Sequence, residues 1–209
     1  MWSAQSDEAL LAQGRASAQG AAGFAQFALP MLAGLREAFA DGARMLDVGT
    51  GVAAMAVAYA ELFPQLTVVG IDVMPRVLEL AEQAVSESSV SDRIILRQQD
   101  VSLLDEPETY AFAWVPAPFI PESALDLGVL RVVESLLPGG WLMLGHGRYG
   151  RSAVDDAVGR FKTIAYGGTA LDDGQAQEML RSTGLVEVGT VPTPEGAPAI
   201  TVGRKPDKA

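Results

Sequence analysis

A short segment that joins a carboxylate to two glycines, Asp47-Val48-Gly49-Thr50-Gly51, follows an apolar run and has the residue types of a ligand-binding turn. Because glycine has no Cβ, Gly49 and Gly51 permit a tight turn and a close approach of the backbone to a ligand. A helix that begins at Val52 would direct free N–H groups toward that ligand. Asp72 ends the next apolar run, where a carboxylate can accept hydrogen bonds from two ribose hydroxyls. The pattern predicts a nucleoside-containing cofactor.

The same turn, taken as Gly49-Thr50-Gly51-Val52-Ala53-Ala54, also fits the G-x-G-x-x-A pattern of dinucleotide sites. Asp47 argues against that ligand, because a carboxylate close to a pyrophosphate would repel it. A carboxylate there suits a cationic ligand with an amino-acid end. A reductase should also carry a pair such as Tyr-x-x-x-Lys, but the residue four positions after Tyr149 is Ala153. An NAD-dependent reductase is therefore only a third interpretation.

Five segments in order resemble the motifs of the class I S-adenosylmethionine-dependent methyltransferases, and the resemblance covers roughly residues 24–204. The segments are Leu46–Gly51, Val69–Asp72, Gln99–Val101, Trp114–Phe119 and Leu137–Leu142. The resemblance implies S-adenosylmethionine as the cofactor. It implies that Asp47 and the two glycines contact the methionine part, Asp72 the ribose and Asp100 the adenine amino group. The complete set of predicted cofactor-binding residues is Asp47, Gly49, Thr50, Gly51, Asp72, Val73, Met74, Asp100, Val101 and Pro116.

Hydrophobic periodicity alternates between strand and helix along the chain. It predicts strands at 45–48, 67–71, 94–97, 111–115, 141–144, 185–191 and 199–203. It predicts helices at 6–19, 24–39, 52–63 and 173–183, one that begins at Pro75 and one capped by Ser123. The resemblance implies an α/β fold with a Rossmann-like, seven-stranded, mostly parallel sheet. In that fold helices cover both faces, the last strand is antiparallel and the strand order is 3-2-1-4-5-7-6.

The chain of 209 residues has the size of one domain, which we expect to cover residues 1–209. We expect a helical leader at 1–40, a cofactor-binding core at 41–146, an insertion at 147–171, and a C-terminal helix and β-hairpin at 172–209. Phe24, Phe27 and Met31 make the leader a candidate lid over the site, and the aromatic residues of the insertion make it a candidate substrate lid.

Composition bounds the acceptor and the location. With 15 basic residues, 26 acidic residues and a net charge of −11, the chain lacks the positive surface that nucleic acids require. No apolar stretch approaches the roughly 18 residues of a membrane span, and the N-terminus does not have the pattern of a signal peptide. We therefore expect a small-molecule acceptor, no nucleic-acid or membrane partner, a cytoplasmic location and a possible homodimer.

The acceptor should bind at the carboxyl ends of the fourth and fifth strands, where strand order reverses. There, His146 is the candidate general base, because a neutral imidazole can take the proton that a hydroxyl loses. The candidate substrate-binding residues are Phe119, Arg148 and Tyr149.

Amide and ring-amine methyltransferases often carry an Asn/Asp-Pro-Pro-Tyr/Phe tetrad after the fourth strand. This chain has Pro116-Ala117-Pro118-Phe119 instead, without a polar acceptor. The favoured function is methyl transfer to an oxygen of a small organic molecule by in-line displacement. C- or N-methylation of a small molecule, and a non-catalytic cofactor-binding subunit, are the alternatives.

Overall fold

The computed structural model describes residues 4–149, 152–193 and 197–208. Its seven strands are β1 (Arg44–Val48), β2 (Thr67–Asp72), β3 (Ile94–Gln98), β4 (Tyr110–Pro116), β5 (Leu136–His146), β6 (Val186–Val191) and β7 (Ala199–Arg204). The α-helices are α1 (Asp7–Gly23), α2 (Leu35–Ala40), α3 (Ala54–Leu62), α4 (Pro75–Ser86), α5 (Glu122–Ser135), α6 (Ala153–Ala165) and α7 (Asp173–Ser182). Short 3-10 turns follow β3 and β4.

All seven strands form one sheet in the order β3-β2-β1-β4-β5-β7-β6. Only β7 runs against its neighbours, pairing antiparallel with both β5 and β6. The predicted fold class, strand order and antiparallel strand are confirmed. Because strand order reverses between β1 and β4, the carboxyl ends of these strands form the crevice in which ligands of such sheets bind.

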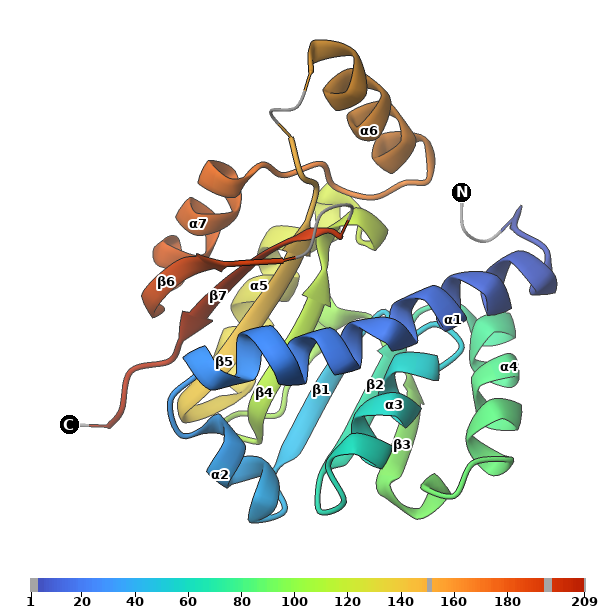
Figure 1. The fold of residues 1–209 in the computed structure, drawn as a ribbon, viewed down its shortest axis with the longest axis vertical. Coiled ribbons are helices and arrows are strands. Elements are labelled where there is room, and N and C mark those ends of the chain that lie inside the picture. The colour runs from blue at the N-terminus through green and yellow to red at the C-terminus, as the bar shows by residue number, and fades with distance from the viewer. Residues whose placement is uncertain (1–3, 150–151, 194–196, 209) are drawn as a thin grey trace.

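The sheet lies between two apolar layers, so its central strands are buried on both faces. One layer packs the leader and α3 on the sheet through an aromatic cluster, in which Phe24 lies 5.0 Å from Phe112 and 5.2 Å from Tyr59 between ring centroids. The other packs α5 and α7 on the opposite face. Figure 1 shows α1 crossing in front of the sheet, with α3 and α4 below it, while β4 and β5 point toward the end of the molecule that carries α6.

The leader differs from the prediction. Helix α1 continues through Gly20 and Gly23 into a π-helical turn (Phe24–Ala28), because packing on α3 and the sheet outweighs the low helix propensity of glycine. The chain breaks at Pro30 and Gly34 instead, and Gly34 has a positive φ of 76°. In place of the predicted helices at 6–19 and 24–39, the structure has one long helix that runs through Gly23 into the π-helical turn, and the short helix α2.

Two further elements differ in detail. Pro121, rather than Ser123, occupies the N-cap of α5, and no side chain caps that end. The insertion at 147–171 contains helix α6, which the sequence analysis did not assign, and its residues 150 and 151 lie outside the described part of the chain. Within the described residues no helix has both the length and the apolar character needed to cross a bilayer.

Candidate functional site

The glycine turn between β1 and α3 is built from left-handed backbone. Gly49 and Gly51 have φ values of 64° and 58°, which glycine adopts without cost. Ala53 has a φ of 58° at the N-cap of α3, a conformation that costs about 1–2 kcal/mol for a residue with a Cβ. The turn is held to β2 by a hydrogen bond from the Thr50 amide to the Ile71 carbonyl, 3.0 Å long. Backbone strain at this point is typical of a site that must hold a ligand.

Asp47 is buried in the turn, with 1% of its surface exposed. Its Oδ2 accepts a hydrogen bond of 2.8 Å from the Thr50 hydroxyl, but its Oδ1 has no hydrogen-bond partner among the described residues. Burial raises the pKa of Asp47 to about 7; the Thr50 hydrogen bond lowers it, and the charge of Asp72 raises it further. A cationic ligand would satisfy the free oxygen and favour the ionised carboxylate.

Asp72, at the end of β2, ties the turn to the next loop. One carboxylate oxygen accepts from the Gly51 amide at 3.0 Å and the other from the Met74 amide at 2.9 Å. Burial raises the pKa of Asp72, and these backbone hydrogen bonds oppose that rise. Each carboxylate oxygen has a second lone pair, so ribose hydroxyls can bond to Asp72 without displacing either amide. Val73, which follows, is exposed.

The remaining predicted cofactor residues frame the turn. Pro116, at the end of β4, lies 3.7 Å from the position that a Cβ on Gly49 would occupy. Asp100 follows β3, and its Oδ1 accepts hydrogen bonds from the amide and the hydroxyl of Ser102, both 2.8 Å long. Val101 is different, because its side chain is buried in the core and packs against Gly128 of α5.

Trp114 is a residue that the sequence analysis placed on the fourth strand without assigning it to the site. It is the register partner of Asp47 on the neighbouring strand, so both side chains lie on the face covered by α1. Its ring packs directly on Gly145 of β5, where an added Cβ would lie 2.3 Å from the indole. Trp114 is only partly buried. The available signal was its position in the fourth-strand segment, two residues before Pro116.

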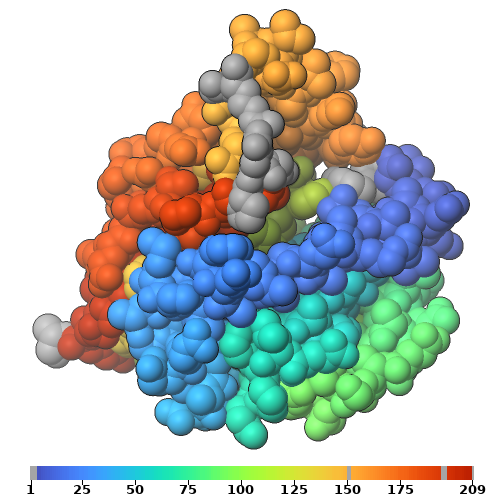
Figure 2. Space-filling view, in the orientation of Figure 1, coloured from blue at the N-terminus to red at the C-terminus, as the bar shows by residue number. Residues whose placement is uncertain are grey.

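Helix α1 packs against the glycine turn through Val52. Gly14 lets it approach closely, since a Cβ there would lie 2.3 Å from Cγ2 of Val52. Leu10 is buried against Val52 and Val77. Near the start of the helix, Asp7 pairs with Arg76 in the first turn of α4. Figure 2 shows a hollow between α1 and the part of the molecule that carries α6.

The geometry agrees with comparisons to known proteins. A family described as "Methyltransferase domain" matches residues 45–140, the segment from β1 into β5 that contains the glycine turn, Asp72, Asp100 and Pro116. The match covers 96 of the 209 residues, and it identifies this segment as a methyltransferase domain. The predicted family and cofactor are thereby confirmed.

Curated relatives match only the core of this chain. The release factor glutamine methyltransferase of Rhodopirellula baltica is 32% identical over 102 residues, which are 48% of this chain and 34% of that protein. The tRNA1(Val) (adenine(37)-N6)-methyltransferase of Vibrio campbellii is 37% identical over 65 residues, 31% of this chain and 27% of that protein. The chain thus spans about a third of the length of these relatives.

Solved structures share the fold over more of the chain. Human N-acetylserotonin methyltransferase, in complex with its cofactor, has a TM-score of 0.66 and 16% identity, with 83% of this chain and 52% of that chain covered. The mitomycin 7-O-methyltransferase MmcR has a TM-score of 0.69 and 19% identity, with 82% and 54% covered. At these identities the likeness concerns the fold.

The glycine turn after β1 fits S-adenosylmethionine. The free Oδ1 of Asp47 would receive the ammonium group of the methionine part, and the left-handed glycines leave room for the ligand beside Pro116. Asp72 would hold the ribose, and the loop that begins at Asp100 would border the adenine. Within the described residues no group of three or more His, Cys, Asp or Glu side chains could hold a metal ion.

His146, the predicted general base, lies at the end of β5 with no exposed surface. Its Nε2 lies 2.9 Å from the Thr201 hydroxyl and its Nδ1 lies 3.1 Å from the Gly147 carbonyl. Burial lowers the pKa of His146, while the Gly147 carbonyl and Asp173 oppose that shift. Both nitrogens are engaged within the protein in this conformation. The geometry is that of a structural histidine, and the role of base remains a sequence-based prediction.

The three predicted substrate residues are not gathered around the turn. Arg148 donates hydrogen bonds to the carbonyls of Thr193 and Ala197. The Arg160 guanidinium packs over the Tyr149 ring, and its Cζ lies 4.1 Å from the ring centroid. Phe119, in the 3-10 turn after β4, is partly exposed. Of the three, Phe119 lies nearest in sequence to Pro116.

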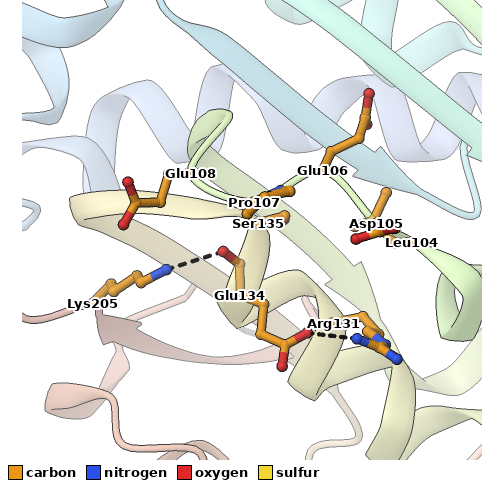
Figure 3. Close-up of a pocket in the computed structure, with 9 residues that line it drawn as sticks. All are labelled: Leu104, Asp105, Glu106, Pro107, Glu108, Arg131, Glu134, Ser135 and Lys205. Atoms are coloured by element: carbon orange, nitrogen blue, oxygen red, sulfur yellow. Dashed lines mark hydrogen bonds and ion pairs between the residues drawn. The ribbon is translucent and has the colours of Figure 1, made fainter.

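A surface pocket of about 310 Å³ lies at the opposite end of the sheet, where the strands begin (Figure 3). Its lining residues are Leu104, Asp105, Glu106, Pro107, Glu108, Arg131, Glu134, Ser135 and Lys205. Its basic groups are engaged: Lys205 donates to the carbonyls of Glu134 and Leu136, and Arg131 pairs with the Glu134 carboxylate. None of the predicted site residues lines this pocket.

Proposed function

We propose that this methyltransferase transfers the methyl group of S-adenosylmethionine to an oxygen atom of a small organic acceptor. The observation that carries the proposal is the buried Asp47 carboxyl, whose unpartnered Oδ1 lies beside the left-handed glycine turn. This arrangement supports a donor with an amino-acid end. The acceptor would lie at the ends of β4 and β5, with Trp114 and Pro116 as apolar walls.

The end of β4 favours an oxygen acceptor over an amide nitrogen. The stretch from Pro116 to Phe119 offers no polar side chain to accept a hydrogen bond from an amide, and the Ala117 carbonyl already accepts from the Thr169 amide. The release factor relative, named for a glutamine substrate, matches less than half of this chain. A tRNA acceptor is disfavoured by the net charge of −11, because phosphate binding depends on basic residues.

The bound donor supplies an activated sulfonium methyl, so the protein's main task is alignment. The acceptor oxygen would bond to the methyl carbon while the carbon–sulfur bond breaks, and the bonding pair would stay on sulfur as a neutral thioether. Positioning alone can contribute about 7–11 kcal/mol to such a step. Because both nitrogens of His146 are engaged, an acceptor that has already lost its proton at neutral pH suits this site best, such as a carboxylate or a phenol made acidic by electron-withdrawing groups.

The test is incubation of the protein with methyl-labelled S-adenosylmethionine and four acceptor classes: phenols, carboxylic acids, a glutamine peptide and tRNA. Label in an ether or ester product supports the proposal. Label in the peptide or tRNA contradicts the acceptor class. Donor binding with no label in any of the four classes leads to a second incubation with amines and carbon acids, in which label indicates N- or C-methylation and no label indicates a non-catalytic subunit. Asp47→Asn serves as the control, because it removes the proposed donor contact and should reduce labelling of every acceptor.

A further inference from the structure

Helix α6 presents an apolar face that no other part of the described chain covers. It is a regular helix of 13 residues, with Ser152 as its N-cap, and none of its residues is buried. Figure 1 shows it standing apart from the sheet and from the other helices. The exposed apolar residues of α6, with the exposed fraction of each, are Val154 (72%), Val158 (46%), Phe161 (72%) and Ile164 (65%).

These side chains form a stripe, because Val154, Val158 and Phe161 follow the three- and four-residue spacing of one helix face. A stripe of this kind on an ordinary surface helix faces the core. Here the opposite side of the helix makes the attachments. Gly159 lies close to the Tyr149 ring, since a Cβ added to it would be 3.5 Å from that ring. Arg160 packs over the same ring.

The attachments fix α6 in this orientation. The Arg160 guanidinium also donates to the Ala170 carbonyl, and the chain after the helix is bound to the turn after β4, because the Thr169 amide donates to the Ala117 carbonyl. Gly168 packs on Pro118 so closely that no Cβ would fit. The apolar stripe therefore lies on the side of α6 opposite these attachments, where its side chains are exposed.

Charges beside the stripe are arranged for an antiparallel partner. Asp155 lies in the first turn and Lys162 in the last turn, and residues seven apart lie on the same flank of a helix. Lys162 has no ion pair within the described residues, whereas Asp155 accepts from the Ser152 hydroxyl at 2.7 Å. A second α6 that runs in the opposite direction would place its Lys162 beside Asp155, and its Asp155 beside Lys162.

We propose that α6 is a self-association surface, and that its occupant is the α6 of a second copy of this chain in an antiparallel, two-fold arrangement. A two-fold axis makes every contact occur twice, so the apolar stripe is covered on both copies and two ion pairs form. The proposal does not depend on the methyl acceptor. Because α6 is bound to the turn after β4, association would also steady the wall of the crevice that follows Pro116.

The test is sedimentation velocity of the full chain from about 1 µM to about 500 µM, a range chosen because small interfaces are weak. We expect a concentration-dependent monomer–dimer equilibrium. Phe161→Glu should weaken it at least tenfold. Leu103→Glu is the matched control, because Leu103 is exposed to nearly the same degree (73%, against 72% for Phe161) but lies outside α6. That variant should dimerise like the unmodified chain.

Charge variants test the antiparallel arrangement itself. Lys162→Glu and Asp155→Lys should each dimerise more weakly alone, because like charges then face one another. An equimolar mixture of the two variants should recover dimerisation, since both pairs are again of opposite sign. A chain that stays monomeric throughout the range, a dimer unaffected by Phe161→Glu, or a mixture that does not recover would each overturn the proposal. If the chain is purely monomeric and Phe161→Glu changes the KM for the acceptor, α6 would instead be a lid over the acceptor site.

Discussion

At the scale of single residues, Asp47 carries the donor assignment. Its pKa is raised to about 7, from an ordinary value of 3.8, so between these two values the folded protein holds a proton that the unfolded chain has released. The native state then binds more protons, and the contribution of Asp47 to stability falls as pH rises from about 4 to about 7. The bound ammonium group would reverse this preference, because it favours the ionised carboxylate.

Asp47→Asn should therefore change both stability and affinity. The unfolding free energy of the ligand-free variant should lose the decline between pH 4 and 7 that Asp47 contributes. Its affinity for S-adenosylmethionine at pH 8 should fall about 10- to 100-fold, since a hydrogen bond to a charged group contributes about 1.5–3 kcal/mol. Urea denaturation across pH and calorimetric titration measure the two effects. Equal affinity in variant and unmodified protein would contradict the ammonium contact.

His146 provides the second residue-scale prediction. Its hydrogen bond to Thr201 and its complete burial predict that His146→Ala costs about 1–3 kcal/mol of stability, because the Thr201 hydroxyl loses its partner. Turnover of an ionised acceptor at saturating substrates should change little at a temperature where the variant stays folded. A general base would show the opposite pattern, with turnover reduced about a hundredfold or more and melting unchanged. Steady-state kinetics and thermal melting on one preparation separate the two.

At the scale of elements, the sequence predicted the features that depend on local residue patterns, and it missed the continuity of α1 and the burial of His146, which depend on packing between distant segments. The glycine turn and the two strand-end acids follow from short-range rules, and the structure brings Asp47 and Asp72 together at that turn. The continuity of α1 through Gly20 depends on packing against α3, which no local pattern contains. The burial of His146 likewise depends on β7, which is distant in sequence. Helix α6 is an exception, because the helical spacing of Val154, Val158 and Phe161 and the N-cap Ser152 are local signals, which the sequence analysis passed over in treating 147–171 as one insertion.

Two glycines of α1 separate packing from propensity in one helix. Gly14→Ala would place a Cβ 2.3 Å from Val52, so α1 must move away from the glycine turn, at a cost of about 1–3 kcal/mol and with weaker donor binding. Gly20→Ala meets nothing closer than the Met55 sulfur at 4.0 Å and should stabilise the protein by up to about 1 kcal/mol. Urea denaturation and donor titration of both variants check the difference. Equal changes in stability and donor affinity in the two variants would mean that the packing of α1 does not influence the glycine turn.

At the scale of the whole molecule, the donor site joins parts of the fold that are distant in sequence. The turn after β1 bonds to Asp72 of β2, lies against Pro116 of β4 and is covered by α1, which is itself paired to α4 through Asp7 and Arg76. A ligand that bridges these elements binds the folded state alone, since the unfolded chain does not bring them together. Its binding free energy is therefore added to the free energy of unfolding.

This linkage predicts a melting shift that discriminates between cofactors. S-adenosylmethionine at a hundred times its Kd should add about 2.7 kcal/mol to the unfolding free energy. For a domain of this size that corresponds to a rise in Tm of roughly 5–10 °C, at about 2–4 °C per kcal/mol. S-adenosylhomocysteine should act similarly, because it keeps the ammonium, ribose and adenine groups, whereas NADH should leave Tm unchanged because Asp47 repels its pyrophosphate. Differential scanning fluorimetry measures all three, with Asp47→Asn as the control in which the first two shifts shrink; a shift with NADH alone would contradict the donor site.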